Sequence, residues 1–205
     1  MKINEIKNLL IDFGGVLINL DRPTCIENFR RLGVKNIENL IGPYRQQGVF
    51  MLLEQGLVTA SEFRDELRKQ STEPMTDIQI DTAWNSFLVD IPTFKLDLLL
   101  KLRESYVVYL VSNTNVIHWE WSCQNVFQYK SLHVNDYFEK MFLSFEIHCA
   151  KPEVEMFQKV IERTALIPEE TLFIDDAEAN CKTAQSLGIN TYQAKTEESW
   201  GHLFE

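Results

Sequence analysis

Residues 6–15 read Ile-Lys-Asn-Leu-Leu-Ile-Asp-Phe-Gly-Gly, an apolar run that ends in an aspartate and two glycines. A short and nearly continuous apolar run is typical of a strand buried on both faces of a parallel sheet. Glycines directly after a strand permit a tight turn and let a ligand approach the backbone. The aspartate, Asp12, is therefore expected at the carboxyl end of a strand, where open α/β sheets bind their ligands. Taken alone, this motif is explained equally well by an ordinary Asp-Gly turn.

Four more apolar runs follow the same pattern, at residues 106–111, 141–145, 172–174 and, more weakly, 190–194. Residues at helical spacing precede two of these runs: Phe94, Leu98, Leu99 and Leu102 before the run at 106, and Phe157, Val160 and Ile161 before the run at 172. Alternating strands and helices indicate an α/β fold with a doubly wound, Rossmann-like parallel sheet. The GxGxxG spacing is absent, so the glycines after Asp12 do not predict a dinucleotide site.

The stretch from residue 21 to residue 90 has no convincing strand and several helix starts. Thr59 and Thr76 each open a capping box, with Glu62 and Gln79 three residues further on. Glycines separate the helices. The pattern predicts an inserted, all-helical domain over residues 21–88, with the α/β core formed by residues 1–20 and 89–205.

Polar residues stand where two further strands end and where a helix begins. Ser112-Asn113 ends the second predicted strand, and a hydroxyl beside backbone N–H groups at a helix start can cradle a phosphate, although a simple N-cap is the commoner explanation. Lys151-Pro152 precedes a helix predicted from residue 153, since proline favours the first helical turn; alone, Lys151 would be a solvated surface charge. Asp175-Asp176 follows a buried strand, and adjacent carboxylates there are costly unless a cation or hydrogen-bond donors compensate them.

In this order along the chain, these motifs resemble those of the haloacid dehalogenase-like (HAD) hydrolase superfamily. The resemblance covers essentially the whole chain, because the helical insertion also stands where the superfamily's C1-type cap domain does. Residues 11–17, 110–115 and 173–180 are most similar to the bacterial subfamily that includes an α-D-glucose-1-phosphate phosphatase. The segment Glu54-Gln55-Gly56-Leu57-Val58, followed by Phe63, also looks like that group.

The resemblance implies a Mg²⁺-dependent phosphatase of small phosphorylated metabolites, sugar phosphates in particular. Asp12 would be the nucleophile that forms an aspartyl-phosphate, and Lys151 would neutralise the transferring group. Ser112, the backbone N–H of Asn113, and His118 would bind the substrate. The alternatives are a catalytically weak relative that binds a phosphorylated ligand or a protein partner, and related chemistry such as C–halogen hydrolysis or phosphoryl transfer between sugars.

The resemblance also implies a set of ligands for the Mg²⁺ ion, which prefers oxygen atoms. They are the carboxylates of Asp12, Asp175 and Asp176 and the backbone carbonyl of Gly14. Which of the two adjacent aspartates contacts the ion directly stays open at this point.

Gly14 departs from the pattern of the superfamily's phosphatases, which usually carry an aspartate there as general acid. Losing a general acid typically costs about 10²–10⁴-fold in rate. A good leaving group, such as an anomeric oxygen, would soften the loss, and so would a substitute acid. Asp21, His118 and Glu54 are the candidates, and each also has an ordinary explanation as a surface or capping group. Gly14 does not indicate a dehalogenase either, since those carry a Tyr-like residue there.

Composition excludes several classes of protein. The 205 residues include 30 acidic residues against 20 Lys plus Arg, a formal net charge of −10. This charge argues against a general nucleic-acid binder, which needs positive surface, but not against local phosphate binding. No apolar run approaches the roughly 18 residues of a membrane span.

Cysteine usage indicates the cell compartment. Cys25, Cys123, Cys149 and Cys181 are scattered, without metal-site spacing, and the N-terminus lacks the apolar run of a secretion signal. We therefore expect a cytoplasmic protein with reduced cysteines that binds neither nucleic acid nor membranes. A monomer and a homodimer are both compatible with the sequence, since Trp119 and Trp121 are expected to be exposed aromatics that leave room for a dimer.

Overall fold

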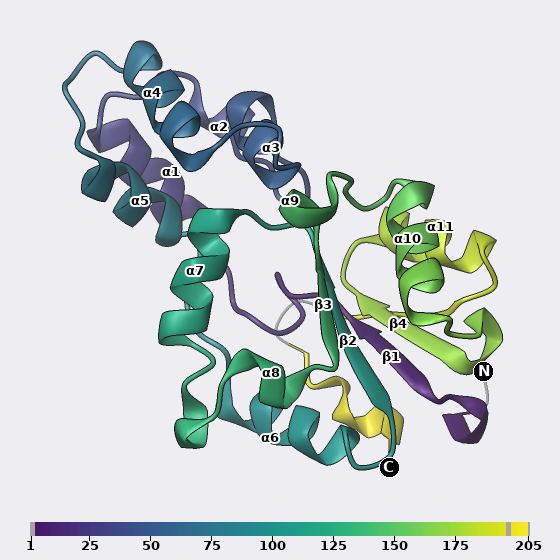
Figure 1. Ribbon diagram of the computed structural model, residues 1–205. Helices are drawn as coiled ribbons and strands as arrows, with labels where there is room; N and C mark the ends of the chain where they lie inside the picture. Colours follow the sequence, from purple (N-terminus) through teal and green to yellow (C-terminus); the bar gives the residue numbers. More distant parts are fainter. Residues whose placement is uncertain (1–2, 196–197, 205) are drawn as a thin grey trace.

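A computed structural model describes residues 3–195 and 198–204 of the chain. Its sheet has five strands in the order β3-β2-β1-β4-β5, and every neighbouring pair is parallel (Figure 1). The strands are β1 (Asn8–Ile11), β2 (Val107–Ser112), β3 (Lys140–Leu143), β4 (Thr171–Asp175) and β5 (Asn190–Gln193). The predicted doubly wound α/β fold is confirmed, and each of the five apolar runs contributes one strand.

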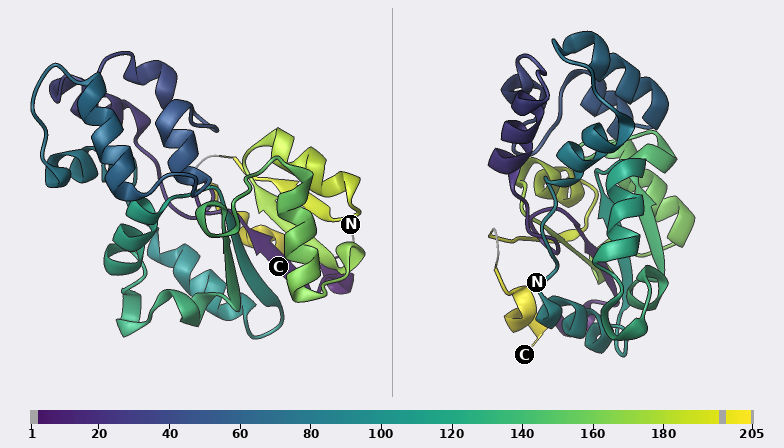
Figure 2. Two further views of the ribbon diagram at one scale, coloured as in Figure 1. Left: turned by 45° about the horizontal axis from the view of Figure 1, so that its top comes forward. Right: turned by 90° about the vertical axis from the view of Figure 1, so that its left-hand side faces the viewer.

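Side chains along each central strand alternate between two apolar layers, as strand geometry requires. Leu9 and Ile11 of β1 face one layer, whereas Leu10 faces the other. Helices α6 (Thr93–Leu102), α7 (Val116–Asn125) and α8 (Val134–Tyr137), with the 3₁₀ turn η4 (Trp200–Phe204), cover the first face. Helices α10 (Val154–Thr164) and α11 (Glu178–Ser186) cover the second (Figures 1 and 2).

The remaining short elements connect these layers. They are η1 (Ile3–Glu5), η2 (Tyr129–Ser131), α9 (Ser144–Ile147) and η3 (Pro168–Glu170). Helix α10 begins at Val154, so Pro152 lies in the preceding turn rather than in the first turn of the helix, where the sequence predicts it. The backbone N–H of Glu153 instead bonds the carbonyl of Ala150, which closes that turn at 2.9 Å.

Five helices lie between β1 and α6, and Figure 1 shows them gathered beyond the carboxyl ends of the strands. They are α1 (Arg22–Arg31), α2 (Ile37–Leu40), α3 (Gly48–Glu54), α4 (Ala60–Gln70) and α5 (Asp77–Asn85). We call residues 21–88 the helical segment. Both predicted capping boxes are confirmed, because Thr59 and Thr76 exchange hydrogen bonds with Glu62 and Gln79.

The chain enters and leaves the helical segment through two adjacent backbone stretches. The N–H of Asn19 bonds the carbonyl of Asp90 at 2.9 Å, and the N–H of Val89 bonds the carbonyl of Asn19 at 2.9 Å. The N–H of Asp21 also bonds the carbonyl of Phe87 at 2.8 Å. This paired junction joins the helical segment to the sheet on the side where the carboxyl ends of the strands lie.

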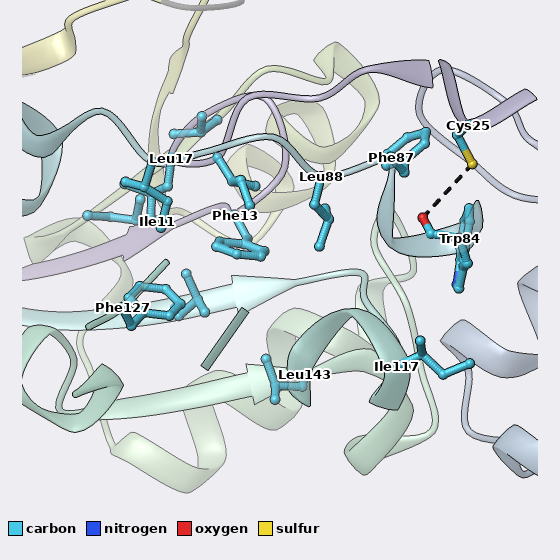
Figure 3. Packing of buried hydrophobic residues seen from close by; sticks show 14 of the residues in the cluster. Ile11, Phe13, Leu17, Cys25, Trp84, Phe87, Leu88, Ile117, Phe127 and Leu143 are labelled. Carbon is cyan, nitrogen blue, oxygen red and sulfur yellow. Dashed lines mark hydrogen bonds between the residues drawn. The ribbon is translucent and has the colours of Figure 1, made fainter. Parts of the chain in front are cut away.

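One apolar cluster runs from the sheet into the helical segment. It includes Phe13 and Leu17 after β1, Phe87 and Leu88 at the junction, and Trp84 on α5 (Figure 3). Burial of such side chains stabilises a fold by roughly 1.5–3 kcal/mol each. The cluster therefore holds the helical segment against the sheet in this arrangement.

Two expectations from the sequence are corrected or limited. Trp119 and Trp121 are half-buried rather than exposed, because both pack against the main apolar cluster; the ring of Trp119 meets that of Phe13 edge-on at 6.0 Å. They therefore give no support to a dimer.

Among the described helices, none has the length and apolar character needed to cross a membrane. Residues 1–2, 196–197 and 205, which belong to the predicted core, lie outside the described residues.

Candidate active site

The carboxyl ends of the three central strands meet in one place. β1 lies between β2 and β4, with Ile11 opposite both Leu110 and Ile174. This is a topological switch point, since the chain continues to opposite sides of β1. Asp12 follows β1 directly, so its carboxylate lies at the centre of the edge where such sheets bind ligands.

A cavity of about 80 Å³ opens at this edge, well above the ~10–15 Å³ that one ordered water needs. Its wall on the sheet side includes Asp12, Gly14, Asn113, His118, Lys151, Asp176 and Asn180. Its opposite wall includes Pro43, Tyr44, Gln46, Glu54, Phe87 and Leu88, which belong to the helical segment. The cavity thus lies between the sheet edge and the helical segment.

Lys151 is buried at the centre of the acidic cluster. Its Nζ lies 2.7 Å from Oδ1 of Asp12 and 2.6 Å from Oδ2 of Asp175, and its side chain is 1% exposed. Burial opposes the charged form, but the two carboxylates outweigh it and raise the pKa of Lys151. The charged form of the ammonium is therefore favoured beside Asp12.

The two adjacent aspartates after β4 have different surroundings. Asp175 is fully buried and accepts hydrogen bonds from Lys151 Nζ, Asn180 Nδ2 and the backbone N–H of Ala177, at 2.6–3.0 Å. Asp176 instead lines the cavity. Burial, followed by the neighbouring charge of Asp175, raises the pKa of Asp176 to about 6. Asp175 therefore orients the lysine, whereas Asp176 faces the space where a ligand can sit.

Gly15 explains how Asp176 comes so close to the loop after β1. A Cβ atom at Gly15 would lie 2.6 Å from Oδ2 of Asp176, and Gly15 has φ of +75°. Only glycine combines that backbone conformation with so close an approach. At Gly14, by contrast, a Cβ atom would meet only Cδ1 of Leu20, at an ordinary 3.4 Å, and its φ is not in the left-handed region.

Replacing Gly15 by alanine should therefore displace the Asp176 carboxylate, while Gly14→Ala should not. We expect Gly15→Ala to weaken Mg²⁺ binding and to lower the free energy of unfolding by about 1–2 kcal/mol, the usual cost of a left-handed alanine. Isothermal titration with Mg²⁺ and thermal melts of both variants check this. Equal Mg²⁺ affinity in the two alanine variants would contradict the assigned role of Gly15.

Three carboxylates face one ammonium in this cluster. Asp12, Asp175 and Asp176 each offer an oxygen, and these atoms lie within 4.8 Å of one another. Burial raises the pKa of Asp12 to about 8; the ammonium of Lys151 counteracts this effect, and the charges of Asp175 and Asp176 add to it. A divalent cation would supply the missing positive charge and keep Asp12 ionised. The all-oxygen donor set suits Mg²⁺.

Ser112 and Asn113 hold the neighbouring loop. Ser112 is 1% exposed, and its hydroxyl donates to the carbonyl of Asn113 at 3.4 Å. The side chain of Asn113 donates to the carbonyl of Lys151 and accepts from its N–H, both at 2.8 Å. This two-way bond fixes the backbone of Lys151 beside β2. Asn115, not Ser112, is the N-cap of α7.

His118 lies in the cavity wall, yet its ring is already engaged. Its Nε2 lies 3.0 Å from the carbonyl oxygen of Trp84, and its ring stacks on the Trp84 ring at 4.1 Å. Burial lowers the pKa of His118 to about 3, so the ring is neutral at physiological pH. Because a carbonyl only accepts, the single ring proton lies on Nε2.

Asp21 has a local structural role instead. It is the N-cap of α1 and accepts hydrogen bonds from the backbone N–H and the hydroxyl of Thr24, at 3.0 and 2.7 Å. These hydrogen bonds lower the pKa of Asp21. It is therefore a poor proton donor.

The sequence patterns gave no functional signal for several residues of the cavity wall. Pro43, Tyr44 and Gln46 come from the irregular loop between α2 and α3, where glycine and proline indicated only a break between helices. Asn180 stands within the quoted 173–180 motif, and its amide bonds Asp175 from the first turn of α11. The position of Asn180, five residues after Asp175 and in the following helix, is the sequence feature that could have indicated this contact.

Comparisons with known proteins agree with this geometry. A D-ribitol-5-phosphate phosphatase from Bacteroides thetaiotaomicron is 37% identical over 195 residues, 95% of each chain. A HAD family enzyme from the same species, crystallised with magnesium and inorganic phosphate and with alanine replacing the aspartate at its own position 12, is 59% identical. The two structures align with a TM-score of 0.95 over 98% of this chain and 99% of that one. A HAD-like family hydrolase from Porphyromonas gingivalis is 35% identical, with a TM-score of 0.91 over 98% and 96% of the two chains.

The family model for haloacid dehalogenase-like hydrolases matches residues 6–188, which include all four motifs. The match thus spans strands β1 to β4, the loops that carry Asp12, Lys151 and Asp176, and the helical segment; β5 lies just beyond it. This chain belongs to the haloacid dehalogenase-like hydrolase family.

Proposed function

We propose that this protein is a Mg²⁺-dependent phosphatase that hydrolyses small phosphorylated metabolites through an aspartyl-phosphate on Asp12. The observation that carries the proposal is the set of Asp12, Lys151 and Asp176 around one cavity at the switch point of the sheet. A protein that only bound a phosphorylated ligand would need no nucleophile, whereas the Asp12 carboxylate faces the cavity, 2.7 Å from Nζ of Lys151. The geometry therefore favours an enzyme over the alternative of a binding protein.

The chain's own residues account for the transfer step. An oxygen of Asp12 attacks phosphorus, the bond from phosphorus to the leaving oxygen breaks, and water later releases the phosphate. Lys151 holds Asp12 in place and balances the charge of the transferring group. Asn113, in the loop between β2 and α7, lines the cavity, and its backbone N–H would orient the oxygens of the phosphoryl group, with the hydroxyl of the adjacent Ser112. Such positioning and charge balance supply most of the catalysis of phosphoryl transfer.

Asp12, Asp176 and the backbone carbonyl of Gly14 would hold the Mg²⁺ ion, with Asp175 behind them. Bound there, the ion supplies positive charge for the phosphoryl oxygens and for the crowded carboxylates. Asp175 is the weaker candidate for direct contact, because Lys151, Asn180 and Ala177 already satisfy its oxygens.

The substrate class is a phosphorylated sugar or polyol. Support comes from the relative that acts on D-ribitol 5-phosphate and from the polar groups of Tyr44, Gln46 and Glu54 on the far wall of the cavity. We propose that the helical segment, residues 21–88, is a cap domain that selects the part of the substrate beyond the phosphate. We further propose that the enzyme is cytoplasmic and acts as a monomer or homodimer without nucleic-acid or membrane partners.

A turnover assay tests the proposal directly. Purified protein should hydrolyse p-nitrophenyl phosphate with Mg²⁺ and lose this activity in excess EDTA. A panel of sugar and polyol phosphates, scored by kcat/KM, should then favour esters of this class. Full activity in excess chelator would refute the magnesium assignment, and no turnover of any ester would refute the phosphatase.

Asp176→Ala should weaken Mg²⁺ binding much more than it weakens the fold. The folded-state pKa of Asp176 lies above its unfolded value, so ionised Asp176 costs stability at neutral pH when no metal is bound. We therefore expect the variant without metal to melt at the same temperature as the wild type or higher. Thermal melts in EDTA and titration with Mg²⁺ measure both effects. A large drop in melting temperature in EDTA would contradict this account.

A further inference from the structure

Gly14 leaves the site without a proton donor where the family's phosphatases usually carry one. Because residue 14 is a glycine, it has no side chain that could protonate a leaving group. The cavity wall on the side of the helical segment carries one carboxyl group, that of Glu54.

Glu54 is held in place by contacts between the helical segment and the core. It is the last residue of α3, which packs against α9 at the end of β3. Two residues on, Gly56 has φ of +64°, and a Cβ there would lie 2.0 Å from the carbonyl oxygen of Phe145. The carbonyl of Gln55 also lies 3.1 Å from Nδ1 of His148. The end of α3 is thus fixed against the sheet edge with Glu54 facing the cavity.

The Glu54 carboxyl sits in surroundings that favour its neutral form. Among the described residues, no group forms a hydrogen bond with it, so its proton is free for a ligand. Burial raises the pKa of Glu54 to about 8, and the charge of Arg45 opposes the shift only in part. Arg45 is itself shared with Glu153, 3.9 Å away. Glu54 is also the last residue of α3, where the helix dipole disfavours a negative charge.

The other titratable groups around the cavity are committed elsewhere. Asp12 and Asp176 belong to the nucleophile and the cation site, and Lys151 is held between two carboxylates. His118 uses its single proton toward the carbonyl of Trp84. The phenol of Tyr44 remains, on a residue that is 64% exposed to solvent.

We propose that Glu54 is the catalytic proton donor to the leaving oxygen, acting from the helical segment in place of a side chain at position 14. The inference rests on the proposed phosphatase function. As the bond from phosphorus to the leaving oxygen breaks, its electron pair stays on that oxygen, which takes the Glu54 proton and departs as an alcohol. In the second step, the oxygen of a water molecule bonds to phosphorus while Glu54, now a carboxylate, takes a proton from that water. The bond between phosphorus and Asp12 breaks, its electron pair returns to the Asp12 carboxylate, and inorganic phosphate leaves. Glu54 is then ready for the next cycle.

The test compares two leaving groups in Glu54→Gln, which keeps the shape of the side chain but has no acidic proton. A proton donor matters most when the departing oxygen is a strong base. With Mg²⁺ present, we expect kcat/KM for a primary alkyl ester such as ribitol 5-phosphate to fall about 10²–10⁴-fold. For p-nitrophenyl phosphate, whose phenolate leaves unaided, it should change little. With the alkyl ester, the wild-type rate should also fall as pH rises above about 8, and this limb should vanish in the variant.

Two further variants serve as controls. Asp21→Asn removes an acid outside the cavity and keeps an N-cap, so both esters should be hydrolysed as by the wild type. Tyr44→Phe removes the rival donor, so the fall in the alkyl-ester rate above about pH 8 should persist in it, whereas this fall vanishes in Glu54→Gln. Suppose that the wild type hydrolyses both esters. If Glu54→Gln lowers kcat/KM equally for both, or for neither, the assignment of Glu54 is overturned while the phosphatase stands. If the wild type hydrolyses neither ester, the proposed function itself fails.

Stability supplies a readout that does not depend on turnover. The folded-state pKa of Glu54 lies above its unfolded value, so its contribution to stability is present at low pH and is lost between about pH 4.3 and pH 8. Glutamine does not titrate. The melting temperature of the wild type should therefore fall relative to that of Glu54→Gln as pH rises from 5 to 8.5. A difference that is independent of pH would overturn the proposal.

Discussion

Asp12→Asn should reduce turnover by at least about 10⁴-fold, the scale on which losing a covalent nucleophile acts in other enzymes. An amide oxygen is a poor nucleophile, so no aspartyl-phosphate can form. The measurement is kcat with p-nitrophenyl phosphate and Mg²⁺, together with a search for phosphorylated protein by mass spectrometry after rapid quenching.

The same variant should keep its fold. The new asparagine would still offer an oxygen to the backbone N–H of Phe13, which lies 2.7 Å from the Asp12 carboxylate, and to Lys151. One negative charge leaves a crowded cluster, so the melting temperature should stay close to that of the wild type. Activity like that of the wild type, confirmed not to arise from deamidated protein, would remove Asp12 from the mechanism.

Lys151→Met should abolish activity and also destabilise the protein, which separates it from Asp12→Asn. Methionine fills a similar volume but leaves the buried carboxylates of Asp12 and Asp175 without their shared ammonium. Breaking a buried ion pair from one side typically costs about 3–5 kcal/mol. Urea unfolding in EDTA measures the loss, and added Mg²⁺ should restore part of the stability without restoring turnover.

Lys182→Met provides the matched control, since it removes a lysine from an ion pair of similar length at the surface. Nζ of Lys182 lies 2.7 Å from Glu178, and both side chains are about two-thirds exposed. Exposed pairs of this kind contribute little to stability. If Lys151→Met were as stable as this control in EDTA, the ion pairs of Lys151 with Asp12 and Asp175 would not stabilise the fold.

The sheet and its acidic edge could be predicted from the sequence because both depend on short-range patterns. Each apolar run became a strand, and residues that follow parallel strands must meet at one edge. The capping boxes at Thr59 and Thr76 are equally local. The division of roles between Asp175 and Asp176 could not be predicted, since it depends on which of them Asn180 and Lys151 reach across the fold.

The far wall of the cavity depends on contacts between distant parts of the chain. Asp21, His118 and Glu54 were equivalent candidates in the sequence, and packing alone separates a helix cap, a stacked neutral ring and a carboxyl that faces the cavity. The sequence likewise could not tell which glycine after Asp12 is left-handed. The structure assigns that conformation to Gly15, so a side chain at Gly14 is compatible with the turn.

The paired junction at Asn19–Asp21 and Phe87–Asp90 has a consequence for how such an enzyme diversifies. Because the two crossing points are neighbours, the 68 intervening residues (21–88) amount to an insertion between adjacent backbone positions, the kind of site where proteins accept domain exchange. An exchange there can replace one helical segment by another while the strands that hold Asp12, Lys151 and Asp176 keep their register. The limit on such grafts is chemical rather than topological: with glycine at position 14, each new module must bring its own acid to the leaving group.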